Sequence, residues 1–194
     1  MLVVTPTRKA AQVAAEQVGA PAQSVAWLLH QHGYRWDDDG RWTRTEPAVT
    51  APRLGRRTLL LVDEAGMLDQ DTARALVIIA DETGARLALV GDRHQLPAVG
   101  RGGVLDLAAR WAGPDASVTL DNIHRFADPD YADLSLAMRS GEHPEAVFDQ
   151  LVQRGQVVLY ADEKSRTAAL ADDSATTTGA LVVADTREQV ADLN

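Results

Sequence analysis

The sequence contains no cysteine, only two lysines, few aromatic residues and no long hydrophobic run. Without cysteine, disulfides, thiolate zinc ligands and thiol nucleophiles are all excluded. No apolar stretch approaches the ~20 residues of a membrane-spanning helix, and the N-terminal segment 1–11 lacks the apolar core of a signal peptide. We therefore expect no membrane insertion and a cytoplasmic location.

Basic charge is also scarce, because 28 acidic residues face 19 basic ones and the formal net charge is -9. This balance argues against a diffuse basic surface for nucleic acid but leaves a local basic groove open. With 45% apolar and 24% charged residues, the composition is typical of a globular protein and not of a disordered one. The 194 residues suffice for one good-sized domain, or for one domain and part of a second.

Short apolar runs alternate along the chain with segments of helical periodicity. Strands are predicted at 2–5, 58–62, 86–90, 117–120, 157–160 and 180–183. Helices are predicted at 8–18, 25–30, 70–82, 104–112, 129–139, 145–154 and 163–170, and from 187 onward. This alternation favours a parallel sheet covered by helices on both faces. The polar segment 33–57 predicts a hairpin or a loose insertion, and the Asp/Ser/Thr-rich segment 172–179 is the best candidate for a linker.

Polar residues follow three of these predicted strands directly. Thr5-Pro6-Thr7 follows the first, Asp63-Glu64 the second and the segment 91–95 the third. Because ligands of such sheets bind at the carboxyl ends of the strands, these residues should meet at one edge. An Asp fixed by an apolar strand can hold Mg²⁺, and the Glu beside it can orient an attacking water. A solvated turn after a core strand is the alternative interpretation.

Gln95 adds a second chemical signal to this edge. Its amide both donates and accepts hydrogen bonds, which suits a sensor of a γ-phosphate or of an attacking water. Taken alone, the segment 91–99 is equally typical of a surface loop punctuated by glycine and proline. Together with Asp63 and Glu64, it favours a nucleotide site.

Four segments resemble motifs of superfamily 1 DNA helicases of the RecD/TraI type. Residues 3–11 resemble motif Ia, 61–67 motif II, 91–103 motif III and 120–126 motif IV. The similarity extends to the helicase region of conjugative relaxases of the TraA/TrwC kind. It implies a RecA-like P-loop NTPase core of the α/β class, with a mostly parallel sheet, helices on both faces and the phosphate-loop strand absent.

The resemblance also implies a domain division and ligands. Residues 1–171 would be a first motor domain, truncated at its N-terminus and carrying the insertion 33–57. Residues 172–179 would be a linker, and 180–194 would start the second motor domain. The intact parent protein would use ATP and Mg²⁺ and would bind single-stranded DNA.

Individual roles follow from the same resemblance. It implies that Asp63 holds Mg²⁺, that Glu64 is the catalytic base and that Gln95 couples phosphate sensing to movement. Arg125 would reach toward the γ-phosphate, although in isolation it is typical of a surface ion pair. The residues implied to contact the DNA backbone are Thr5, Pro6, Thr7 and Lys9. Without the resemblance, Lys9 is simply an exposed lysine at the start of a helix.

One element of a working motor is missing from these residues. A phosphate-cradling loop has the pattern Gly-x-x-x-x-Gly-Lys-Ser/Thr, whereas here Lys9 follows Arg8 and Lys164 follows Glu163. We therefore expect that the chain alone neither hydrolyses ATP at a useful rate nor unwinds DNA. The resemblance places the missing strand beside 86–90, so we expect an open sheet edge that invites self-association.

Three functional hypotheses stay open from the sequence. The first is part of an ATP-dependent single-stranded-DNA translocase or helicase in conjugative plasmid DNA transfer. The second is a RecD-like exonuclease V alpha subunit in DNA repair, and the third is a non-catalytic DNA-binding or assembly remnant. The tryptophans at 27, 36 and 42 offer stacking faces for bases, but aromatic residues near an amphipathic segment more often belong to a core. Five scattered histidines do not form a metal-binding pattern.

Overall fold

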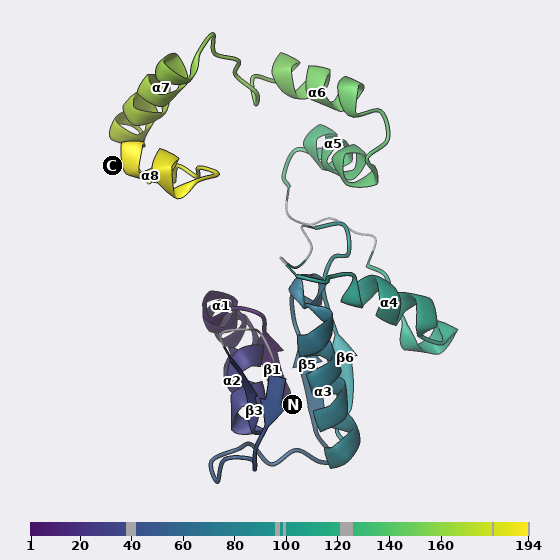
Figure 1. Cartoon of the computed structure of the whole chain (residues 1–194). Coiled ribbons are helices and arrows are strands. Elements are labelled where there is room, and N and C mark those ends of the chain that lie inside the picture. Colours follow the sequence, from purple (N-terminus) through teal and green to yellow (C-terminus); the bar gives the residue numbers. More distant parts are fainter. Residues whose placement is uncertain (38–41, 96–97, 99, 121–125, 180, 194) are drawn as a thin grey trace. The chain divides into compact units, whose positions relative to one another are not determined.

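The computed structural model describes residues 1–194 except 38–41, 96–97, 99, 121–125, 180 and 194 (Figure 1). The chain divides into two compact units, Met1–Ala127 and Asp128–Asn194. This division lies well before the linker predicted at 172–179. The first five residues of that segment belong to helix α7, Glu163–Thr176, so they do not form an irregular linker.

A parallel sheet forms the centre of the first unit. Its strands are β1 (Leu2–Thr5), β2 (Ala22–Ser24), β5 (Leu59–Val62) and β6 (Arg86–Leu89). In the described residues the order is β2-β1-β5-β6, and every neighbouring pair is parallel. The predicted α/β fold with a parallel sheet is thereby confirmed. No strand of the described chain pairs with the outer edge of β6, the edge that was expected to be open.

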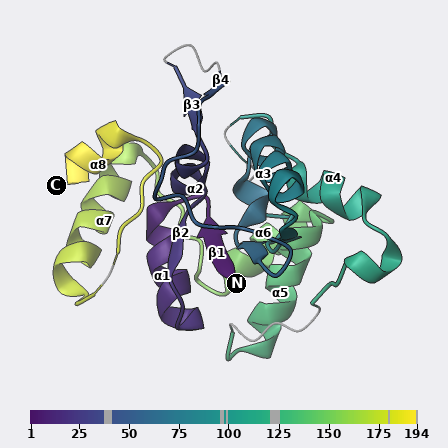
Figure 2. The same ribbon diagram turned by 90° about the horizontal axis from the view of Figure 1, so that it is seen from below.

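Helices cover both faces of this sheet. Helix α1 (Arg8–Val18) joins β1 to β2, α2 (Val25–Gln31) follows β2, and α3 (Gln70–Thr83) joins β5 to β6. Crossovers between parallel strands are right-handed. The chain adds β2 on one side of β1 and then crosses back to add β5 and β6 on the other side, so the direction in which strands are added reverses after β2. That reversal puts α1 on one face and α2 with α3 on the other, where these two helices pack together (Figure 2).

Side-chain caps fix where these helices begin. Thr7, Ser24 and Asp69 each accept a hydrogen bond from the backbone N–H three residues further on. Such caps satisfy donors that the first helical turn leaves without partners, typically worth ~1 kcal/mol each. Helix α3 ends at Gly84, whose φ of 71° is a left-handed conformation that glycine adopts readily. The observed starts of α2 at Val25 and of α3 at Gln70 agree with the predicted helices 25–30 and 70–82.

The hydrophobic core lies between the sheet and helices α2 and α3. Its largest fully buried side chains include Leu28 and Leu29 from α2, Leu60 from β5, and Leu76 and Ile79 from α3. The spacing of these residues on each helix is what the apolar periodicity predicted. The core holds β1 and β5 in place and thereby fixes the strand ends at which polar residues follow.

The polar insertion contains the hairpin that the sequence suggested. Strands β3 (Tyr34–Trp36) and β4 (Trp42–Arg44) pair antiparallel. Arg44 makes a two-pronged ion pair with Glu82 of α3, with both nitrogen–oxygen distances at 2.6 Å. The hydrogen bonds from Arg44 lower the pKa of the Glu82 carboxyl. The hairpin is therefore anchored to the helical face of the first unit.

The remaining elements are short or helical. The first unit also contains the 3₁₀ turns η1 (Ala65–Met67) and η2 (Pro114–Ala116) and the helix α4 (Val104–Trp111). The second unit contains α5 (Pro129–Ser140), α6 (Pro144–Gln153), α7 and α8 (Arg187–Leu193). Within it, Arg154 forms an ion pair with Asp128, the N-cap of α5. None of the described helices has the combination of length and apolar composition that a membrane span requires.

Three strand predictions are wrong. Residues 117–120, 157–160 and 181–183 form no strand, and Val118, Leu159 and Leu181 are largely exposed. An apolar run becomes a strand only where a neighbour satisfies its backbone hydrogen bonds. In the described chain none of these runs pairs with another strand, so their backbone groups gain no ladder hydrogen bonds. The three-residue strand β2, in contrast, is too short to give a periodic signal and was not predicted.

The buried side chain of His32 should make the stability of the fold depend on pH. The side chain is buried where α2 ends, and its Nε2 has no hydrogen-bond partner in the described structure. Burial, with a further contribution from Arg44, lowers the pKa of His32 below 6.5. The unfolded chain therefore takes up a proton before the folded chain does, and stability falls as the pH drops below about 6.5.

Replacing His32 by glutamine should flatten this dependence below pH 6.5 by up to ~1.4 kcal/mol per pH unit, the equivalent of one proton. Urea titrations at a series of pH values provide the measurement. His30 on the same helix is exposed, so His30→Gln is the matched control and should leave the slope unchanged. An unaltered slope in His32→Gln would assign the pH dependence to other groups.

Candidate functional site

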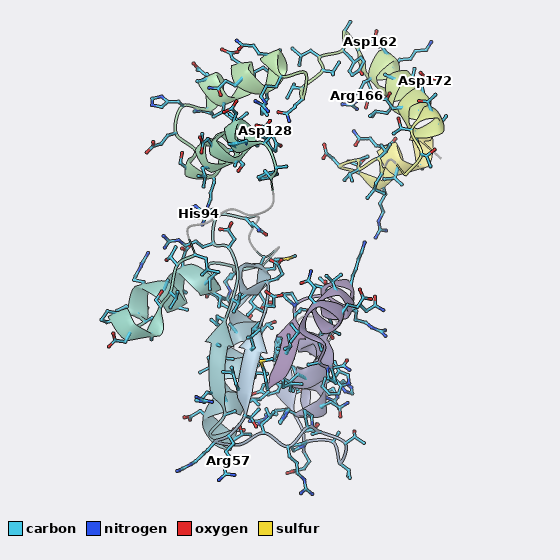
Figure 3. The ribbon with its side chains drawn as sticks, turned by 180° about the vertical axis from the view of Figure 1, so that it is seen from behind. Arg57, His94, Asp128, Asp162, Arg166 and Asp172 are labelled. Atoms are coloured by element: carbon cyan, nitrogen blue, oxygen red, sulfur yellow. The ribbon has the colours of Figure 1, made fainter. Side chains whose placement is uncertain are left out.

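Backbone hydrogen bonds hold the ends of β1, β5 and β6 side by side. The Asp63 N–H donates to the Val4 carbonyl at 2.9 Å, and the Val90 N–H donates to the Val62 carbonyl at 2.8 Å. The Ala65 N–H then donates to the Val90 carbonyl at 2.8 Å. The loops after these three strands therefore lie next to one another at the carboxyl edge of the sheet, as the sequence predicted. Figure 3 labels His94 at this end of the first unit and Arg57 at the opposite end.

Two glycines allow the loop after β5 to touch the loop after β6. A β-carbon added to Gly66 would lie 2.8 Å from the Asp92 carbonyl oxygen. One added to Gly91 would lie 2.9 Å from the Ala65 nitrogen. Both clashes are with backbone atoms, which side-chain rotation cannot relieve. The acid-bearing turn and the segment that carries Gln95 are thus packed backbone to backbone.

The acid pair occupies the turn directly after β5. Asp63 and Glu64 are both half-buried, and Asp63 Oδ1 accepts a hydrogen bond from the Glu64 N–H at 3.0 Å. Glu64 has φ 55° and ψ 37°, the left-handed region. A residue with a β-carbon costs ~1–2 kcal/mol there. Such strain is characteristic of functional sites, where the surrounding structure holds a side chain in a required direction.

Gln95 lies in an exposed turn that its neighbours define. The Gln95 N–H donates to the Asp92 carbonyl at 3.3 Å, and the His94 N–H donates to Asp92 Oδ1 at 2.9 Å. The Gln95 side chain is exposed at the same edge as the acid pair. Arg125, the fourth residue of the predicted catalytic set, lies outside the described residues. The catalytic roles of all four residues stay predictions.

The loop after β1 begins with a buried residue, Thr5, which the sequence predicted to contact DNA. Thr5 is completely buried, and its hydroxyl donates to the Thr7 carbonyl at 2.7 Å. Thr5 offers no surface to a ligand in this structure, and its predicted contact with DNA stays a prediction. Its hydroxyl instead holds the loop in shape. Pro6 is half-buried, whereas Thr7 and Lys9 are exposed at the start of α1.

The donor set at the strand ends suits the metal-bearing part of a Mg²⁺–ATP complex. Mg²⁺ is commonly held by one or two carboxylates together with phosphates and waters, and a half-buried Asp63 at a rigid strand end fits this pattern. Among the described residues, no group of three or more His, Asp or Glu side chains forms a cage for a metal ion. The 194 residues contain no lysine-bearing phosphate loop, so the donors for the β- and γ-phosphates are not part of this sequence.

Sequence reasoning missed a cleft beside the loop after β1. It has a volume of about 430 Å³, and its lining includes Pro6, Trp36, Trp42, Met67 and Arg101. These residues come from four separate segments, so no local pattern could reveal the cleft. The signal present in the sequence was two tryptophans flanking the polar segment 37–41.

A parallel sheet with an acid turn and a glycine-rich loop packed together at adjacent strand ends defines a RecA-like α/β core. The sequence matches the AAA domain family over residues 1–162. The chain belongs to this family.

Two solved structures of Pif1 helicase from Bacteroides are similar to this chain. For Pif1 bound to single-stranded DNA, the TM-score is 0.51 at 16% identity, over 91% of this chain and 47% of that one. For Pif1 in complex with ADP-AlF3 and single-stranded DNA, the TM-score is 0.49 at 15% identity, over 97% of this chain and 51% of that one. The chain thus spans about half the length of these Pif1 chains. The first of the two likenesses supports the same helicase-like α/β fold.

Proposed function

We propose that this chain is part of the first motor domain of an ATP-dependent translocase or helicase that moves on single-stranded DNA. The observation that carries the proposal is the close packing of the Asp63-Glu64 turn against the loop that leads to Gln95, through Gly66 and Gly91. This arrangement brings Asp63, Glu64 and Gln95 to one edge of the sheet, which supports their proposed roles as metal ligand, base and phosphate sensor. The AAA domain match and the Pif1 fold likeness support it.

Each residue at this edge has a proposed chemical role. Bound Mg²⁺–ATP supplies the phosphoanhydride bond whose hydrolysis drives movement. Asp63 would hold the metal through its carboxylate, and Glu64 would accept a proton from the attacking water. Gln95 would contact the γ-phosphate or the water through its amide, and Arg125, which lies outside the described residues, would neutralise the phosphate charge. Gly66 and Gly91 allow the backbones of the two loops to touch. We therefore propose that a displacement of the Gln95 loop is passed directly to the Glu64 turn.

The loop after β1 is the proposed contact for single-stranded DNA. Pro6, Thr7 and Lys9 lie at the start of α1, where a hydroxyl, backbone amides and one ammonium group are available to phosphates. Contacts of this type position a strand without reading its sequence. The Pif1 structures, which contain single-stranded DNA, support this choice of partner.

Several finer features are proposals that rest on the sequence resemblance. We propose that the intact parent is a conjugative relaxase, with a RecD-like repair helicase as the alternative. Tyrosine and histidine motifs in the coding sequence upstream would identify the relaxase. We also propose that the open edge of β6 pairs with a strand of a second copy. Light scattering that finds only monomer at every concentration would contradict this pairing.

Binding of a fluorescent oligo(dT) strand by the 194-residue chain tests the proposal. Affinity should fall with salt, and Lys9→Ala should reduce the slope of log K against log salt by ~0.7, the value for one lost single-strand phosphate contact. Lys164 is the only other lysine and lies in α7 of the second unit, so Lys164→Ala is the matched control. The same samples should show no ATP turnover, because the phosphate loop is missing. No DNA binding, or ATP turnover that Glu64→Gln abolishes, would contradict the proposal.

A further inference from the structure

The β3–β4 hairpin presents an aromatic face, and the outermost ring of this face is exposed to solvent. Tyr34 and Trp36 lie two residues apart on β3, and Trp42 pairs directly with Trp36 across the hairpin. Side chains with this spacing share a face of the strands. The Tyr34 and Trp42 rings meet edge to face at 5.8 Å, and the Trp42 and Trp36 rings lie at 5.4 Å with a 39° tilt. Tyr34 is buried, whereas Trp36 is 51% exposed, so the ring series ends in solvent.

Trp36 and Trp42 of this aromatic face form one wall of the cleft beside the loop after β1. Pro6 and the half-exposed Met67 line the cleft together with the two tryptophans. The cleft is therefore continuous with the loop proposed to hold the DNA backbone. It also borders the turn that carries the acid pair, because Met67 lies three residues after Glu64.

The rim of the cleft is polar. Arg101 pairs with Asp71 at 3.3 Å, and both side chains are exposed. Asp69 is fully engaged as the cap of α3, since its two oxygens accept from the N–H and the hydroxyl of Thr72. The exposed rim thus carries one guanidinium and one carboxylate, groups that are able to hydrogen-bond to the edge of a planar heterocycle.

We propose that this cleft takes one unpaired base of single-stranded DNA, stacked on the exposed face of Trp36. An aromatic wall, an apolar lining and a polar rim are the features that hold a base without demanding a particular sequence. The volume of about 430 Å³ lies in the range of small-molecule sites. The inference rests on the proposed function, because Pro6 belongs both to the cleft and to the proposed DNA-binding loop.

The test compares variants of Trp36 in the 194-residue chain, with oligo(dT) and an abasic strand of equal length as probes. Trp36→Ala should weaken oligo(dT) binding by ~5- to 100-fold, the range for loss of one base stack. Trp36→Phe should retain most of the affinity. Trp111 is 82% exposed on α4 and does not line the cleft, so Trp111→Ala is the matched control and should bind as the parent chain does.

The abasic strand separates stacking from general loss of structure. It should bind the parent chain and Trp36→Ala equally well, because no base is present to stack. Oligo(dT) should also quench the tryptophan fluorescence of Trp111→Ala, which keeps Trp36. The quenching should be smaller in Trp36→Ala, which has lost the stacking ring. Equal oligo(dT) affinity in the parent chain and Trp36→Ala would overturn the cleft assignment while leaving the proposed function intact. Failure of the parent chain to bind either strand would instead count against the proposed function.

A second copy of the chain is the competing occupant. Light scattering of the parent chain and of Trp36→Ala distinguishes it. A concentration-dependent dimer that Trp36→Ala dissociates, without any change in DNA affinity, would assign the cleft to self-association and overturn the proposal. An unchanged oligomeric state together with the loss of DNA affinity supports it.

Discussion

Replacing Glu64 by glycine is expected to stabilise the fold and at the same time to abolish ATP hydrolysis. The left-handed conformation of Glu64, with φ 55°, costs a residue with a β-carbon ~1–2 kcal/mol, and glycine adopts it without that cost. Part of this gain is offset because glycine loses more conformational freedom on folding. The net expectation relative to Glu64→Ala is a gain of ~1 kcal/mol, or ~2–4 °C in Tm for a chain of this size.

The activity should change in the opposite direction. Removing a general base typically lowers a rate ~100- to 10,000-fold. We expect this loss for Glu64→Gly, Glu64→Ala and Glu64→Gln alike, measured in a longer form of the protein that also carries a phosphate-binding loop. The thermal stability is measured in the 194-residue chain itself.

Three substitutions at one position separate the backbone from the carboxylate. Glu64→Gln removes the proposed base and keeps both the side-chain volume and the backbone strain. Glu64→Ala removes the proposed base and the side-chain volume but keeps the backbone strain. Only Glu64→Gly relieves the strain. If glycine and alanine at this position gave equal stability, the turn would not be strained, and retention of ATP turnover in all three variants would exclude Glu64 as the base.

The parts of the fold that the sequence predicted are those with a strong local signal. The α3 helix has a cap at Asp69, a buried periodic face and a glycine stop at Gly84, and each of these acts within a few residues. The strands β1, β5 and β6 are continuous apolar runs that all have parallel neighbours. Local propensity and tertiary environment agree in these elements, so sequence reasoning reaches the correct result.

The failures come from interactions between distant segments. The run 117–120 has the composition of a strand, but whether it becomes one depends on a partner that no local pattern specifies. The opposite error occurs at β2, where three residues pair with β1 because the helix before them ends at the right place. Strand identity in a parallel sheet is therefore partly a property of the neighbours.

The candidate site divides in the same way. The positions of Asp63, Glu64 and Gln95 follow from the rule that parallel strands end at one edge, so the sequence was sufficient to group them. The burial of Thr5 was not predictable, because it depends on a hydroxyl that turns inward to the Thr7 carbonyl. The left-handed backbone at Glu64, in a turn packed against the loop that follows β6, likewise has no signal in the local sequence.

Replacing Gly33 by alanine is expected to destabilise the chain more than any other single glycine-to-alanine change among the described residues. Gly33 joins α2 to the hairpin at φ 85°. A β-carbon there would lie 2.0 Å from the Thr45 carbonyl oxygen and 2.9 Å from its carbon. The same two residues are joined by a hydrogen bond from the Thr45 N–H to the Gly33 carbonyl at 2.9 Å, so the strand cannot move away without losing it.

Two costs add in Gly33→Ala, and a second glycine separates them. The backbone conformation costs ~1–2 kcal/mol and overpacking adds ~1–3 kcal/mol, which together predict a loss of ~2–5 kcal/mol. Gly19 has a similar φ of 64° at the end of α1, and nothing lies within 4 Å of its added β-carbon. Gly19→Ala should therefore show only the first cost in urea or thermal unfolding.

Hydrogen exchange locates the damage in Gly33→Ala. The Thr45 amide should lose its protection, because its hydrogen bond to the Gly33 carbonyl breaks when the base of the hairpin detaches. The Trp36 and Trp42 rings should separate for the same reason. If the proposed base-binding cleft depends on that hairpin, oligo(dT) affinity should fall in Gly33→Ala and not in Gly19→Ala. Equal destabilisation of the two variants would mean that the hairpin shifts to admit the methyl group, and that the contact between Gly33 and Thr45 does not fix its position.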